Sequence, residues 1–210
     1  SPAGRGAAQG ADAAAIARHG CGGSRMAQDG RMAFSSKPFS FSFSSECDGR
    51  QAPQVAEGLD YLHARQIVHR DLNTRNVLLA SDLSAKIADF GCARVLPPGG
   101  RLRTTTVLGS PAYMSPEQMR GDELTTAIDT WALGLLLWEM MMETKPWEGQ
   151  YNDYQSLSAA VMRGERVPIP AARPPFPPRF LGVIHAAQQM APQDRPSASA
   201  MRLAIAAAVR

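Results

Sequence analysis

Residues 69–76 of this 210-residue chain read HRDLNTRN, and they are its most informative stretch. They contain a carboxylate at Asp71 and an amide at Asn76, and short apolar runs flank them at 67–68 and 77–80. Apolar runs of this length, bounded by polar or turn residues, are typical of brief strands. The polar residues of this stretch are therefore expected to lie between two short strands.

Further short motifs follow along the chain. A third brief strand is predicted at 85–88 (AKIA), and DFG follows it directly at 89–91. GSPAYMSPE occupies 109–117, DTWALG occupies 129–134 and DRPS occupies 194–197. Each motif alone has a high chance rate, but their occurrence together, in this order and at these intervals, is a specific signal.

Together the motifs resemble those of the eukaryotic protein kinases, in which H-R-D-x-x-x-x-N, D-F-G and A-P-E follow one another. The resemblance covers residues 51–210 and corresponds to the large C-terminal lobe of a kinase of the serine/threonine type. It implies a mostly α fold with a few short β-strands, in which the N-terminal lobe is largely absent. The function that it implies is transfer of the γ-phosphate of ATP to Ser or Thr hydroxyls of a protein substrate.

The resemblance also implies roles in phosphoryl transfer, a reaction that depends on positioning and charge neutralisation. Asp71 would accept the proton of the substrate hydroxyl. Asn76 and Asp89 would bind Mg²⁺ through hard oxygen atoms and so hold the ATP phosphates. Phe90 would pack beneath the site, and Leu78 either floors the adenine pocket or is ordinary strand core.

Other residues of the motifs are expected to support the site. His69 is interpreted as a buried packing and hydrogen-bonding residue rather than a general base. Glu117 and Arg195 would form a buried ion pair that ties the segment around Glu117 to the late helices. Asp129 would accept hydrogen bonds from the backbone of the HRD loop.

A regulatory switch is a further hypothesis. In the family, an arginine at the position of Arg70 can bind a phosphate on the following loop through a charge-assisted contact. The loop from 92 to 108 offers Thr104, Thr105 and Thr106. One of these threonines is either a phosphorylated switch or an ordinary polar loop residue.

Two positions bear on the substrate class. The segment 110–114 (SPAYM) resembles serine/threonine kinases, in which a small hydroxyl residue faces the catalytic aspartate. Asn73 stands where most of these kinases have a lysine that contacts the transferred phosphate. An asparagine at this position resembles the tyrosine-kinase-like branch of the serine/threonine kinases.

The first 50 residues differ in composition from the rest. They are predicted to be a low-complexity, disordered segment, although residues 34–45 alternate Phe and Ser with the period of a half-buried strand. A phosphate-binding G-x-G-x-x-G-x-V loop and a V-A-I-K lysine are not found in this sequence. The chain is therefore expected to bind ATP-Mg²⁺ weakly and to catalyse little. The alternative function is a catalytically inactive kinase fragment that acts as a binding or regulatory module.

Helical spacing of apolar residues organises most of the chain after residue 50. The predicted helices are 53–64, 124–142, 154–163, 179–190 and 198–209, and a Pro-rich connection occupies 167–178. The most apolar run, 131–142, is shorter than the roughly 20 residues that a membrane span requires, so it is predicted to be a buried core helix.

The charge and cysteine content of the chain argue against several kinds of partner and site. The formal net charge is +3, from 22 basic and 19 acidic side chains scattered along the chain, so a nucleic-acid partner is not expected. The three cysteines form no C-x-x-C pair and are too few for a disulfide framework, and neither a structural zinc site nor an oxidising compartment is expected. We expect a cytoplasmic protein.

Overall fold

The computed structural model describes residues 51–104, 106–169 and 178–209. The expectations for residues 1–50, for Thr105 and for most of the Pro-rich connection lie outside the described residues. Within the described ranges, helices dominate and the strands are short, as the sequence predicted.

The elements follow one another in a simple order. The α-helices are α2 (Gln51–Ala64), α3 (Pro116–Arg120), α4 (Ala127–Met142), α5 (Tyr154–Met162), α6 (Pro178–Ala187) and α7 (Ala198–Val209). The strands are β1 (Ile67–Val68), β2 (Val77–Leu79), β3 (Ala85–Ile87) and β4 (Arg94–Val95). Among the described residues there are also four 3-10 turns: η1 (Thr74–Asn76), η2 (Phe90–Cys92), η3 (Pro111–Tyr113) and η4 (Pro192–Asp194).

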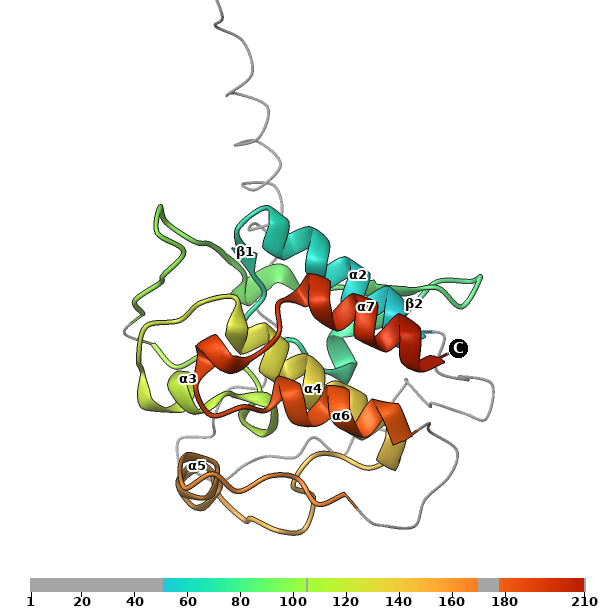
Figure 1. The fold of residues 1–210 in the computed structure, drawn as a ribbon. Helices are drawn as coiled ribbons and strands as arrows, with labels where there is room; N and C mark the ends of the chain where they lie inside the picture. Colours follow the sequence, from blue (N-terminus) through green and yellow to red (C-terminus); the bar gives the residue numbers. More distant parts are fainter. Residues whose placement is uncertain (1–50, 105, 170–177, 210) are drawn as a thin grey trace, which may run out of the picture.

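Helix α4 is the centre of the core. Its residues 128–141 are all buried, because the helix is apolar on nearly every face and is surrounded by other elements. Figure 1 shows α4 in the middle of the helical body, with α6 beside it and with α2 and α7 packed against each other. A Cβ at Gly134 would lie 2.6 Å from the Cβ of Ala187, so the close approach of α4 and α6 requires glycine there.

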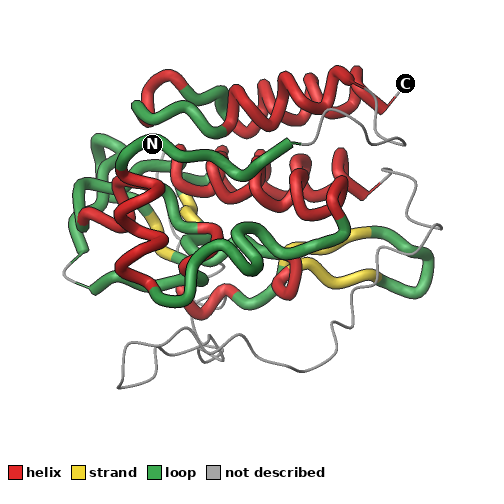
Figure 2. The backbone as a smooth tube through the Cα atoms, turned by 90° about the horizontal axis from the view of Figure 1, so that it is seen from below, coloured by secondary structure: helices red, strands yellow, loops and turns green. Residues whose placement is uncertain are grey.

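Two antiparallel strand pairs frame the motif loops. β1 pairs with β4, and β2 pairs with β3 so that Val77 lies opposite Ile87 and Leu79 lies opposite Ala85. The two pairs are separate in space (Figure 2). The register of the second pair continues into a hydrogen bond of 2.8 Å from the Ala88 backbone N–H to the Asn76 carbonyl. The residues before DFG are thereby fixed beside the end of the HRD loop.

Several boundaries differ from the predicted ones. Leu124 was expected in a helix, but it forms an antiparallel bridge with Leu102, with both backbone hydrogen bonds at 2.8 Å, and α4 begins only at Ala127. The predicted helix 179–190 ends at Ala187. The short helix α3 and strand β4 had no periodic pattern long enough to reveal them.

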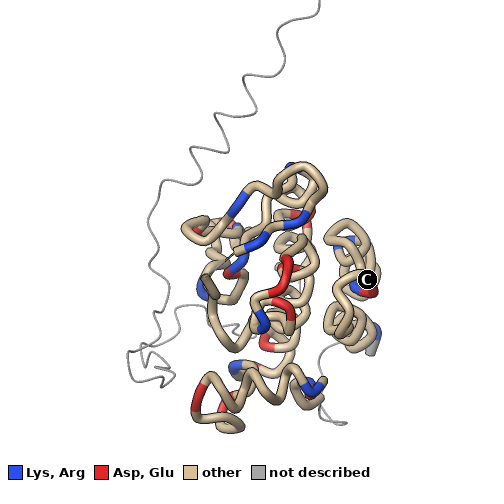
Figure 3. Tube along the Cα trace, turned by 90° about the vertical axis from the view of Figure 1, so that its left-hand side faces the viewer, with Lys and Arg blue, Asp and Glu red and all other residues tan. Residues whose placement is uncertain are grey.

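Lys and Arg residues and Asp and Glu residues are interspersed along the described part of the backbone (Figure 3). Among the described residues, no helix combines the length and the apolar character that crossing a bilayer requires.

Candidate active site

The carboxylate of Asp71 is held by donors from two separate segments. Its Oδ1 accepts hydrogen bonds from the Ser110 backbone N–H at 2.8 Å and from Asn73 Nδ2 at 3.0 Å. Its Oδ2 lies 3.3 Å from Asn76 Nδ2. Asp71 is only 7% exposed, so these contacts fix the carboxylate in one orientation at the edge of the core.

Asp129 at the start of α4 shapes the loop that carries Asp71. Its two carboxylate oxygens accept the backbone N–H groups of His69 at 2.8 Å and of Arg70 at 2.9 Å, and His63 Nε2 lies 2.9 Å from Oδ2. Burial alone would raise the pKa of Asp129, but the hydrogen bond and charge of His63, together with His69, outweigh burial and hold the pKa below its usual value. An ionised Asp129 therefore anchors the backbone directly before Asp71.

Asn76 and Asp89 offer oxygen atoms suited to Mg²⁺. Asn76 Nδ2 donates to the Asp71 carbonyl at 2.7 Å as well as contacting its carboxylate, so the Asn76 Oδ1 atom is turned away from Asp71. Asp89 adopts the left-handed conformation (φ 56°), and its side chain is exposed and accepts the Gly91 N–H at 3.3 Å. Mg²⁺ is usually bound by one or two carboxylates or amides plus phosphates and water. The donor set of Asn76 and Asp89 fits that ion.

His69 is packed rather than open to solvent. It is fully buried, its Nε2 atom lies 3.0 Å from the Ala88 carbonyl oxygen, and its ring meets the Phe90 ring edge to face at 5.3 Å. The imidazole thus links the HRD loop to DFG through the residue that precedes Asp89.

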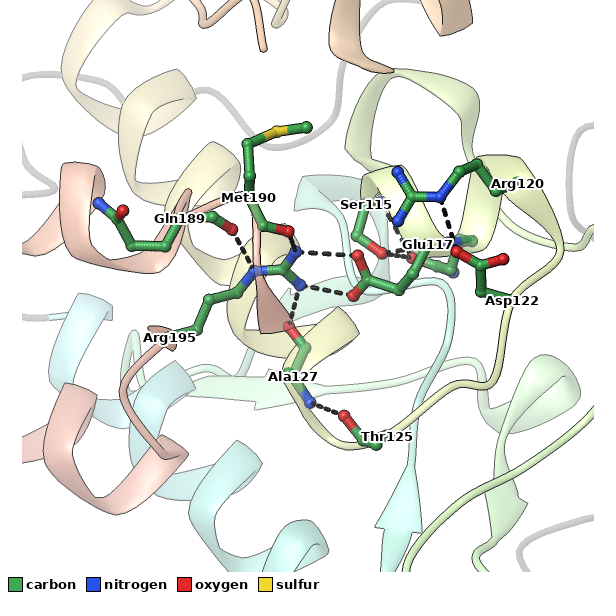
Figure 4. Close-up of polar contacts among 10 residues, drawn as sticks. Ser115, Glu117, Arg120, Asp122, Thr125, Ala127, Gln189, Met190 and Arg195 are labelled. Atoms are coloured by element: carbon green, nitrogen blue, oxygen red, sulfur yellow. Dashed lines mark hydrogen bonds and ion pairs between the residues drawn. The ribbon is translucent and has the colours of Figure 1, made fainter. Parts of the chain in front are cut away.

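Glu117 of α3 and Arg195 form a buried bidentate ion pair, with N–O distances of 2.6 and 2.8 Å (Figure 4). Arg195 also donates to the backbone carbonyls of Ala127, Gln189 and Met190. The guanidinium carbon lies 4.9 Å from the centroid of the Trp131 ring. The pair therefore ties α3 to the start of α4 and to the segment after α6.

Arg70 and two of the candidate switch threonines line one small cavity of about 40 Å³. Thr104 and Thr106 are joined there by hydrogen bonds of 3.1 and 3.2 Å. Thr105 lies outside the described residues. The structure thus brings Arg70 to the threonine loop, and whether one of these threonines is phosphorylated stays a prediction.

Leu78 is 55% exposed, so the interpretation of this residue as ordinary strand core is wrong. It lies opposite Lys86 in the β2–β3 pair, and neighbouring Leu79 is the residue that packs on the core. The alternation of exposed and packed side chains along β2 explains the difference, because successive residues of a strand point to opposite faces.

Sequence reasoning missed a buried cluster around Glu139 of α4. Its Oε2 atom accepts hydrogen bonds from Thr74 Oγ1 at 3.1 Å and from the Tyr113 hydroxyl. Burial raises the pKa of Glu139 to about 7, although these hydrogen bonds and the charges of Lys145 and Arg75 favour ionisation. The feature of the sequence that could have indicated this cluster is an acidic residue, Glu139, inside an apolar run.

Comparison of the sequence with known proteins identifies a family. The family model of the protein kinase domain matches residues 31–203, so the match begins upstream of residue 51. The chain is 34% identical over 146 residues to a probable serine/threonine-protein kinase of Dictyostelium discoideum. It is 35% identical over 146 residues to a probable LIM domain-containing serine/threonine-protein kinase of the same organism, and 35% identical over 145 residues to human serine/threonine-protein kinase Nek5.

These alignments cover 70%, 70% and 69% of the chain but only 15%, 21% and 20% of the relatives' lengths. The chain therefore spans about a fifth or less of each of these relatives. Because the family model covers most of the sequence, the chain belongs to the protein kinase domain family.

Proposed function

We propose that the described residues are the C-terminal lobe of a serine/threonine protein kinase that transfers the γ-phosphate of ATP to a protein hydroxyl. The observation that carries the proposal is the Asp71 carboxylate, which Asn73, Asn76 and Ser110 hold in one orientation. A carboxylate positioned in this way can orient an acceptor hydroxyl and take its proton. Protein kinases generally use ATP and Mg²⁺.

The remaining polar residues would position the nucleotide. Asn76 and Asp89 would hold Mg²⁺, which when bound neutralises charge on the phosphates. The bond between the Ala88 N–H and the Asn76 carbonyl keeps the two ligand-bearing segments together. Asp129 and His69 act on the reaction only through the backbone that they anchor.

Two observations support the substrate class and the branch. Ser110, a small hydroxyl residue, donates its backbone N–H to Asp71, and the named relatives are serine/threonine-protein kinases. Asn73 in place of lysine supports the tyrosine-kinase-like branch.

The cavity that Arg70 lines together with Thr104 and Thr106 supports control by phosphorylation. A phosphate on Thr104 or Thr106 would bring negative charge to a cavity that Arg70 lines. Phosphopeptide mapping of active protein tests this proposal, and finding these threonines and Thr105 all unmodified would contradict it.

The test of the activity is a phosphate-transfer assay with Mg²⁺-ATP and a generic protein substrate. The protein that carries this chain is compared with its Asp71→Asn variant, which keeps the size of the side chain but cannot take the proton. We expect the variant to lose at least about 10²-fold in rate. A wild-type protein as inactive as the variant would favour the alternative, a binding or regulatory module without catalysis.

A further inference from the structure

Two short turns carry groups that hold the Asp71 carboxylate. Asn73 is the N-cap of η1, and its Nδ2 atom donates to Asp71 Oδ1 at 3.0 Å. Ser110 is the N-cap of η3, and its backbone N–H donates to the same oxygen atom at 2.8 Å. The orientation of the Asp71 carboxylate therefore depends on where these two turns lie relative to each other.

A buried cluster of Thr74, Tyr113 and Glu139 joins the two turns. Thr74 belongs to η1 and Tyr113 to η3, and their hydroxyl oxygen atoms lie 3.3 Å apart. Both hydroxyl groups donate to one atom, Oε2 of Glu139, and the bond from Thr74 measures 3.1 Å. All three residues are buried. A single carboxylate oxygen of α4 thus fixes the separation of the turns.

The charge of Glu139 determines how firmly it holds these hydroxyl groups. A hydrogen bond to a carboxylate is roughly twice as strong as one between neutral groups. A protonated carboxyl group is a donor as well as an acceptor, so it adds a third proton to a cluster in which two hydroxyl groups already donate to it. The ionised form of Glu139 is therefore the form that fits the observed contacts best.

The groups around Glu139 place its titration near neutral pH. Burial raises the pKa of Glu139 to about 7, against the opposing effects of the two hydroxyl groups and of the positive charges of Lys145 and Arg75. Burial and the charge of Glu139 raise the pKa of Tyr113 well above 10, so Tyr113 keeps its proton throughout this range. Glu139 is thus the member of the cluster whose charge changes near neutral pH.

We propose that Glu139 is a positioning residue for phosphoryl transfer, whose ionised carboxylate holds η1 and η3 in the relation that keeps Asp71 in its working orientation. This inference rests on the proposed kinase function. The proton that Glu139 releases passes to water and takes no part in the transfer. Activity should therefore rise with pH as Glu139 ionises. The stability of the fold should fall over the same range, because the folded state binds that proton more tightly than the unfolded chain.

The first experiment measures kcat for phosphate transfer to a generic protein substrate as a function of pH, with the protein that carries this chain. In wild type, kcat should rise about fivefold, with its midpoint at the Glu139 pKa of about 7. Glu139→Gln keeps the size of the side chain without the charge, so its kcat should stay at the low level across this range. A rise of the same size in Glu139→Gln overturns the proposal.

A second variant shifts the titration without touching the hydrogen bonds. The charge of Lys145 favours the ionised form of Glu139, so Lys145→Gln should move the midpoint of the kcat profile to higher pH. Tyr113→Phe should move it in the same direction and also lower kcat above the midpoint, because it removes one of the two donors. Thermal melting controls for folding. Should Glu139→Gln fail to fold, Lys145→Gln decides the matter, and an unchanged midpoint overturns the proposal.

Hydrogen exchange supplies a readout that needs no turnover. The Ser110 backbone N–H donates to Asp71, so its protection factor, corrected for intrinsic exchange at each pH, reports that bond directly. In wild type, this protection should increase as Glu139 ionises, and in Glu139→Gln it should not. A merely structural role predicts the opposite, a fall in protection, because the fold loses stability over the same pH range.

The two readouts separate this proposal from the proposed function. If wild type transfers no phosphate at any pH, the kinase function is contradicted, and the Ser110 protection factor still decides the role of Glu139. If wild type transfers phosphate but the protection of Ser110 responds to pH equally in wild type and in Glu139→Gln, the kinase function stands and Glu139 does not position Asp71.

Discussion

Glu139 shows how one residue can link several parts of this site. A carboxyl group inside an apolar helix loses most of its hydration, and it is retained here by hydroxyl donors from the HRD loop and from the segment 110–113. The three side chains connect α4 to both segments that hold Asp71. Protonation of Glu139 therefore bears on the geometry of the site as well as on stability.

The raised pKa of Glu139 predicts a dependence of stability on pH. Because the folded-state pKa of about 7 exceeds the ordinary value of 4.5, the folded protein binds the proton more tightly than the unfolded chain. Its contribution is fully present below pH 4.5 and is lost as pH rises through 7. Glu139→Gln should flatten this fall, which amounts to about 3 kcal/mol.

Urea denaturation of both proteins at several pH values between these limits measures the effect. If the free energy of unfolding of the wild type falls with pH no more steeply than that of Glu139→Gln, the raised pKa of Glu139 is contradicted. Asp129, whose pKa is lowered, contributes stability that is lost only as pH falls below its ordinary value of 3.8, so the two groups titrate in separate windows.

At the scale of elements, the packing of α4 against α6 depends on Gly134, which has no side chain. Gly134→Ala would place a methyl group 2.6 Å from the Cβ of Ala187, so the helices must move apart. We expect a loss of about 1–3 kcal/mol in the free energy of unfolding. Gly182→Ala in α6 is the matched control, because a Cβ there meets nothing within 4 Å and alanine favours a helix. Equal unfolding midpoints in urea for the two variants would refute this packing argument.

The ion pair between Glu117 and Arg195 is the second link between elements. Arg195→Met should destabilise the fold by about 3–5 kcal/mol, because it leaves the Glu117 carboxylate buried without its partner. Adding Glu117→Gln should recover part of the loss, since the uncompensated charge is then gone. A double-mutant cycle measured by chemical denaturation tests this coupling, and strictly additive losses would argue against it.

At the scale of the whole molecule, the β2 strand presents one leucine to solvent and one to the core. Leu78→Ser should change the free energy of unfolding by less than about 0.5 kcal/mol, because Leu78 is exposed. Leu79→Ser, the neighbouring control, should cost at least about 1 kcal/mol because Leu79 packs on the core. Urea denaturation compares the two variants, and equal losses of stability in Leu78→Ser and Leu79→Ser would contradict this difference in burial.

The sequence predicted those features of the structure that have a short motif or a regular spacing of apolar residues. The partners Glu117 and Arg195 lie far apart along the chain, yet both belong to motifs whose resemblance implied their contact. Leu124 was misplaced because its apolar spacing suits the following helix, while its backbone is paired with Leu102. The Glu139 cluster was not predictable, because a buried carboxyl group alone does not reveal donors that lie 65 and 26 residues away in sequence.

The hydrogen bond between Ala88 and Asn76 has a consequence for how this chain can vary in length. The turn at 80–84 joins β2 to β3 at the end remote from Asp89, and its residues are mostly exposed, so an insertion there leaves the pairing of Val77 with Ile87 intact. One residue added between Ile87 and Asp89 would instead move Asp89 one residue further along the chain from the pair with which Asn76 is in register. Natural variants should therefore differ in size at the tip of this hairpin and keep a constant count of residues at its base.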